Sequence, residues 1–174
     1  MANDSSTDPI GDYLESMEVG FRTIDGGIYD HKMHNFGYTG KHISSIDCSI
    51  HFGEGGRVFT VFGMVNNKIP KNKVNEVLQI VNLANQLARF GTMIMDTEDG
   101  SFWSRHGNAS ATDVEPVVYD AMIKNVCRMV DDFYPLIMKV IYGDKNAEEV
   151  IEEWRNQDSE KSVKPIPSDI SGYQ

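Results

Sequence analysis

The sequence lacks an apolar run long enough to cross a membrane, which takes about 18 or more residues. Its first six residues are polar and acidic, whereas a secretory signal needs a basic start followed by an apolar stretch. We therefore expect the protein to stay in the cytoplasm, where it is made, and to have no membrane partner.

Cysteine is scarce, with only Cys48 and Cys127 in 174 residues. Neither belongs to a C-x-x-C pair, which excludes the usual zinc and redox motifs. A reducing cytosol favours free thiols, so the expected state is two reduced cysteines. The spacing alone does not say whether they lie near each other.

Basic clusters are also missing, and the formal net charge is −10. Residues 1–20 hold five acids and no base, and residues 144–174 hold eight acids and four bases, while the stretch between them is nearly neutral. Because Lys and Arg must neutralise phosphates in a complex with nucleic acid, this distribution predicts no nucleic-acid partner.

What the sequence does contain is alternating apolar patterning typical of strands. Residues 43–52 alternate strictly, which predicts a strand with one buried and one wet face. Residues 57–65 are apolar on both faces, which predicts a central strand that is covered on both sides. Residues 31–41 fit either a strand or a loop.

Turn signals connect further strands. Asp25-Gly26-Gly27 is typical of a hairpin tip, with Ile24 before it and Ile28-Tyr29 after it. Glu98-Asp99-Gly100 predicts a second hairpin between strands at 92–96 and 102–105. Gly53-Glu54-Gly55-Gly56 leads from strand to strand, so a hairpin is favoured over a phosphate-binding loop, which would lead into a helix.

Four helices are expected. Asp8 and Pro9 can begin one over residues 8–21, and Pro70 begins another that runs to about Arg89. Thr112 has capping-box spacing to Glu115 and predicts the start of a long helix that Pro135 should kink or interrupt. Gly143 should end this helix, and a short helix at residues 147–155 should follow.

These elements predict an α+β fold, with an antiparallel sheet of about five strands flanked by helices. Residues 8–155 should form a single domain. Residues 1–7 should be a flexible N-terminus, and residues 156–174 a flexible polar C-terminal tail.

One stretch resembles a known family. Ile69-Pro70 opens a helix that contains Glu76-Val77-Leu78 and then residues 81–85, followed by Gly91, an alternating strand and residues 96–100. This order, with the later Tyr134-Pro135 and Gly143, resembles the YbjN family of bacterial and archaeal proteins, which are labelled sensory transduction regulators. The similarity covers roughly residues 10–153.

The resemblance implies a fold similar to that of type III secretion chaperones, in which helices flank a twisted antiparallel sheet and the protein is often a homodimer. Those chaperones bind extended segments of client proteins. The family has no accepted biochemical activity, so it implies no catalytic residues and no cofactor.

Candidate catalytic and metal sites are weak in this sequence. His31 and His34 would share a face only on a helix, and no third metal ligand is evident. Asp47, Ser49 and His51 project from one strand at spacings of two, so they form a row instead of a catalytic triad. We therefore expect neither a metal site nor an enzyme, although a hydrolase or metal enzyme with dispersed residues stays open as an alternative.

The least ordinary feature is a set of methionines with aromatic neighbours. Their spacing favours a plain core, but methionine also suits surfaces that adapt to varied apolar partners. A second hypothesis is that these residues form a binding surface. In it, Met93, Met95, Phe102 and Trp103 line a site for a protein or extended peptide, in a groove between helix and sheet or beside an exposed sheet edge. The alternative is a homodimer that covers this apolar surface.

Overall fold

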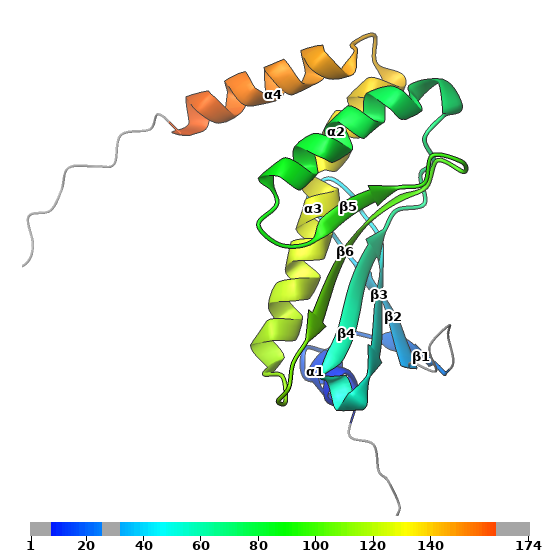
Figure 1. Ribbon diagram of the computed structural model, residues 1–174, viewed down its shortest axis with the longest axis vertical. Coiled ribbons are helices and arrows are strands. Elements are labelled where there is room, and N and C mark those ends of the chain that lie inside the picture. Colours follow the sequence, from blue (N-terminus) through cyan, green and yellow to red (C-terminus); the bar gives the residue numbers. More distant parts are fainter. Residues whose placement is uncertain (1–7, 26–31, 163–174) are drawn as a thin grey trace, which may run out of the picture.

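Six strands form one antiparallel sheet in the computed structural model, which describes residues 8–25 and 32–162 (Figure 1). The strands are β1 (Phe21–Ile24), β2 (Lys32–Tyr38), β3 (Ile46–Gly53), β4 (Val58–Met64), β5 (Thr92–Met95) and β6 (Phe102–Ala109). Their order is β1-β2-β3-β4-β6-β5, and every neighbouring pair is antiparallel. The α+β class is confirmed. The stretch that fitted either strand or loop contains β2.

The helices cover one face of this sheet. They are α1 (Pro9–Ser16), α2 (Val74–Leu87), α3 (Pro116–Tyr142) and α4 (Ala147–Ser162), with short 3-10 turns η1 (Glu54–Gly56) and η2 (Lys71–Lys73). The long helix α3 packs on β4 and β6, and α2 packs on α3 and β5. In Figure 1, α1 lies at one end of the sheet and α4 at the other.

The buried side of β3 follows the predicted alternation. Ile46, Cys48, Ile50 and Phe52 are at most 5% exposed and belong to the core. For β4, the central position is confirmed, but cover on both faces is wrong. Phe59 and Val61 face the helices and are buried, whereas Phe62 is half-buried and Met64 is 40% exposed on the opposite face. Apolar residues on both faces do not by themselves bring a second layer of helices.

The helix starts were predicted with mixed success. The Asp8 carboxylate accepts a hydrogen bond from the Gly11 N–H at 2.9 Å, which confirms it as the cap of α1. The predicted cap at Thr112 is wrong, because α3 begins at Pro116 and its N-cap residue Glu115 makes no side-chain cap bond.

Pro135 does not end α3, which continues to Tyr142 and stops at Gly143 as predicted. The helix has a buried face on both sides of the proline. Val130 precedes Pro135, and Ile137 and Val140 follow it, all fully buried. This packing offsets the backbone hydrogen bond that proline cannot donate.

The predicted boundary between domain and tail is also wrong at residue 156, because α4 continues to Ser162. No glycine or proline lies between Arg155 and Ser162, so nothing in the local sequence breaks the helix there. Residues 1–7 and 163–174, for which flexible ends were predicted, and residues 26–31 of the predicted hairpin tip lie outside the described residues. Over the described ranges, no helix has the length and apolar character to span a bilayer.

Candidate functional site

The structure does not bring the four predicted docking residues together. Met93 and Phe102 are each 1% exposed and lie in the core, so their proposed role as groove lining is wrong. Met95 pairs with Phe102 on the helix-covered face, where it packs against the core. Trp103 lies opposite Met64 on the uncovered face. Alternate residues of a strand point to opposite faces, which separates Trp103 from the other three.

The second predicted binding mode, addition of a strand at a sheet edge, meets an obstacle at β5. The Met93 N–H donates to Oδ1 of Asn85 at 2.7 Å, and Nδ2 of Asn85 donates to the Met93 carbonyl at 3.0 Å. Asn85 belongs to α2, and β5 is the last strand of the sheet. The side chain therefore occupies the backbone groups that an added strand would use.

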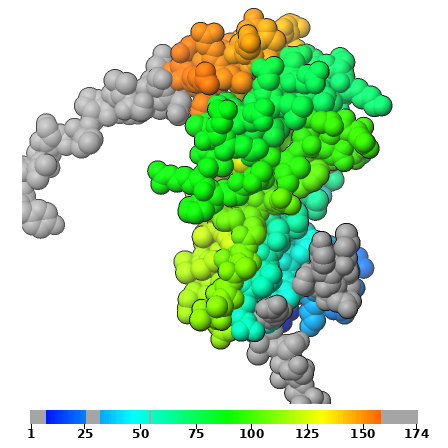
Figure 2. Space-filling model, in the orientation of Figure 1, coloured from blue at the N-terminus to red at the C-terminus, as the bar shows by residue number. Residues whose placement is uncertain are grey.

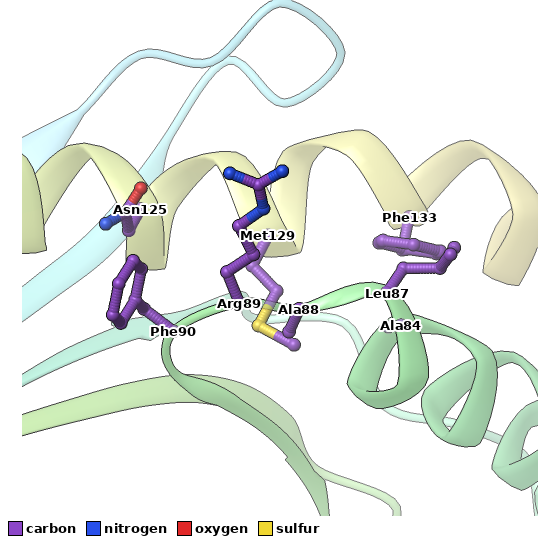
Figure 3. Close-up of a pocket in the computed structure, with 8 residues that line it drawn as sticks. All are labelled: Ala84, Leu87, Ala88, Arg89, Phe90, Asn125, Met129 and Phe133. Atoms are coloured by element: carbon purple, nitrogen blue, oxygen red, sulfur yellow. The ribbon is translucent and has the colours of Figure 1, made fainter.

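An apolar groove opens instead where α2 ends beside α3 (Figure 3). After α2 ends at Leu87, the chain leaves the helix and turns at Gly91, whose φ of +81° suits glycine. This turn leaves Leu87 53% exposed and Phe90 65% exposed. Met129 and Phe133 of α3 face them across a hollow of about 370 Å³.

The groove continues toward α4, because two of its apolar side chains are shared with a neighbouring hollow. Leu87 and Phe133 also line a second hollow of about 600 Å³, together with Leu136 and Trp154. The rings of Phe133 and Trp154 lie 6.2 Å apart. In Figure 2, the green surface of α2 and its following turn lies between the orange surface of α4 and the yellow-green surface of α3. We call the two joined hollows the α2–α3–α4 groove.

Phe90 is positioned by a ring contact with the sheet. It stacks on His106 of β6, with ring centroids 5.9 Å apart and an interplanar angle of 16°. Burial lowers the pKa of His106, and its Nδ1 is buried without a hydrogen-bond partner in the described part of the chain. A neutral ring therefore supports Phe90, so the structure gives His106 a packing role.

Positive side chains lie along the groove. Arg89 lines one hollow, and Lys41 and Lys139 line the other, where Asp132 is the acid present. Arg89 and Lys41 are exposed and form no ion pair within residues 8–25 and 32–162. In a chain with net charge −10, this is a local reversal of sign.

A buried carboxylate holds the loop that carries Lys41. Asp131 is 5% exposed and accepts hydrogen bonds from the backbone N–H groups of Lys41, His42 and Ile43, at 2.7, 2.8 and 2.9 Å. Burial acts to raise the pKa of Asp131, but the three N–H donors outweigh it and hold the pKa below its usual range. A Cβ at Gly40 would collide with the same carboxylate, which explains the glycine there.

The histidine predicted as a weak metal candidate has a different role. His34 is fully buried between the rings of Phe21 and Phe52, each at 4.6 Å. Its Nε2 lies 2.9 Å from the Asp8 carboxylate, and its Nδ1 lies 3.1 Å from the Thr23 hydroxyl. His31 lies outside the described residues. Among those that are described, no three His, Cys, Asp or Glu side chains converge as a metal site.

The order Thr23–His34–Asp8 is that of a nucleophile, a base and an orienting acid. However, the ring is enclosed, and the same carboxylate caps α1 through Gly11. The arrangement therefore ties α1 to β1 and β2. His51, which the sequence placed in a row with Asp47 and Ser49, packs its ring on Phe62 at 5.0 Å on the uncovered face of the sheet.

Comparison with known proteins bears on the fold. No family model matches the sequence, and no curated protein matches it. Among solved structures, the crystal structure of YbjN from E. coli, described as a candidate transcription regulator, aligns with a TM-score of 0.53. The alignment covers 86% of this chain and 92% of that one, at 8% identity. The chain has the YbjN fold. The resemblance seen in the sequence is confirmed at this level, and at such low identity the likeness to YbjN extends to the fold alone.

Sequence reasoning missed Leu87 and Phe90 as binding residues. Both are apolar, one at the last position of the helix and one just before the turn glycine Gly91, and this is the signal that could have identified them.

Proposed function

We propose that the protein is a non-catalytic docking module that binds an apolar segment of another protein in the α2–α3–α4 groove. The observation that carries this proposal is the exposure of Leu87 and Phe90, at 53% and 65%, directly beside an apolar hollow. Large apolar side chains gathered at one concave place are typical of interaction sites.

The charges indicate the chemistry of the partner. Two exposed cations, Arg89 and Lys41, lie in the two hollows of the groove and form no ion pair with any residue that the structure describes. A segment with apolar anchors and carboxylates would complement them, and the charge contacts would govern orientation and association rate more than affinity. Asn85 closes the β5 edge at Met93. We therefore favour a partner that inserts side chains into the groove over one that adds a strand to this edge.

The first prediction concerns groove variants. We expect Phe90→Ser and Leu87→Ser each to weaken binding of an acidic amphipathic peptide at least about tenfold, since each removes an anchor contact. A library of labelled peptides screened by fluorescence anisotropy would supply the ligand. Val117→Ser is the matched control, because Val117 is 68% exposed on α3 but does not line the groove.

The affinity should also fall as salt rises and when the acids of the peptide are replaced by lysine. If no apolar peptide binds, or if the groove variants bind as well as Val117→Ser, the docking proposal is wrong.

A second candidate function is self-association through the uncovered face of the sheet. Phe62, Met64 and Trp103 share this face with Ile94, and Met64 is 40% exposed. A sheet face that carries apolar side chains and no helix would suit packing against a second copy of the same sheet. This homodimer uses a different surface, so the two functions are separable by experiment.

A further inference from the structure

We infer that Cys48 and Cys127 form an oxidation site, at which an internal disulfide can join the sheet to α3. Their Sγ atoms lie 3.3 Å apart, although the residues come from β3 and α3. Both are free thiols, and both are buried, at 2% and 0% exposure. A disulfide bond is about 2.05 Å long, so the sulfur atoms need to approach by only about 1.3 Å.

The close approach has a structural cause in the neighbouring strand. Gly63 of β4 is the register partner of Cys48, and a Cβ on Gly63 would lie 2.9 Å from Cγ1 of Val126. The missing side chain lets α3 lie close to the sheet at this point. Cys127 follows Val126 directly and therefore reaches Cys48.

The same surroundings make the thiols slow to react in the folded protein. The contact with Cys48, together with burial, raises the pKa of Cys127, whereas the reactive form of cysteine is the thiolate. Oxidation therefore requires α3 to separate from the sheet, or takes place during folding. Once closed, the bond is shielded from reducing agents by the same core.

The oxidant is a small dialkyl disulfide such as oxidised glutathione. One cysteine thiolate attacks a sulfur of the oxidant, which forms a mixed disulfide and releases one thiolate. The second cysteine then attacks the protein-bound sulfur and releases the other thiolate. Two protein thiols are oxidised and one small disulfide is reduced to two thiols, so electrons and atoms balance.

The bond would close a loop of roughly 80 residues, which in the chain-entropy account restricts the unfolded state strongly. We expect the Tm of the oxidised protein to rise by on the order of 10 °C. The bond would also tie α3 to the sheet two residues before Met129, which lines the groove.

The test refolds the reduced full-length protein with oxidised and reduced glutathione, blocks free thiols with N-ethylmaleimide, and maps the unreduced digest by mass spectrometry. We expect a peptide pair linked through Cys48 and Cys127, with the higher Tm, and reversal of both by dithiothreitol in denaturant. Cys48→Ala and Cys127→Ala should each abolish the link and the rise in Tm.

The inference is overturned if refolded protein with a native circular dichroism spectrum keeps both thiols free. It is likewise overturned by thiols capped with glutathione or bonded between two copies, or by an equal rise in Tm in the single variants.

Discussion

At the residue scale, two buried polar side chains, Asp131 and His34, are held by partners far away in the sequence. Asp131 binds the loop at Lys41, some 90 positions earlier, and His34 binds Asp8 of the N-terminal helix. A buried polar group without such a partner is costly, so these pairs help to specify how the segments dock. The pattern of the sequence places Asp131 on α3 but does not identify what it binds.

The Asp131 contact has a defined pH dependence. The folded-state pKa is lowered, so the stabilisation is fully present above the unfolded pKa of about 3.9 and is lost as pH falls through the folded value. We expect Asp131→Asn to lower the free energy of unfolding by about 2 kcal/mol at neutral pH, because an amide replaces a carboxylate that accepts three hydrogen bonds.

Urea unfolding at several pH values checks this prediction. The gap between the wild type and Asp131→Asn should shrink below about pH 4. Asp132→Asn is the control, since Asp132 is exposed and should shift stability by less than about 0.5 kcal/mol. A gap that stays constant down to about pH 2 would contradict the assignment.

At the element scale, strands and helices follow local periodicity, while their ends and edges depend on contacts. The apolar stripe predicted α2 because helical spacing is a property of neighbouring residues. The failed cap at Thr112 and the uninterrupted α3 at Pro135 show packing overriding local signals. The closed β5 edge depends on Asn85, whose side chain reaches the backbone of Met93 eight positions later.

Removing that amide should therefore open the sheet edge. We expect Asn85→Ala to lower the free energy of unfolding by about 2 kcal/mol, because two hydrogen bonds to the backbone of Met93 are lost. It should also increase aggregation on heating, since an unpaired strand edge recruits other chains.

Urea unfolding and light scattering during a thermal ramp measure the two effects. Gln86→Ala is the control, because Gln86 is the exposed neighbour on the same helix. If the two variants behave alike, Asn85 does not protect the edge.

At the scale of the whole molecule, the helices of the described residues lie on one face of the sheet, and none of these helices covers the other face. The uncovered face holds Phe62, Met64 and Trp103, and the groove lies on the helical side. Two apolar surfaces on opposite sides allow self-association and partner binding at the same time. A dimer through the sheet would leave the groove open.

Light scattering coupled to size exclusion tests this arrangement. If the protein is a dimer through the sheet, Met64→Lys should make it monomeric, because a charge would be buried at the interface. Phe90→Ser should leave the dimer intact. A wild type that is monomeric at all concentrations would contradict the homodimer. If Phe90→Ser abolishes the dimer, the interface lies at the groove and not on the sheet.

The sequence by itself determined the class of fold, the strong strand and helix segments, the α1 cap and the end of α3, because these depend on residues a few positions apart. Only the tertiary structure decided which face of β4 is covered, which residues line the groove and which thiols meet. Those features arise where segments distant in the chain pack together. Met93 and Leu87 are both apolar residues near the end of an element, and the fold alone buries the first and exposes the second.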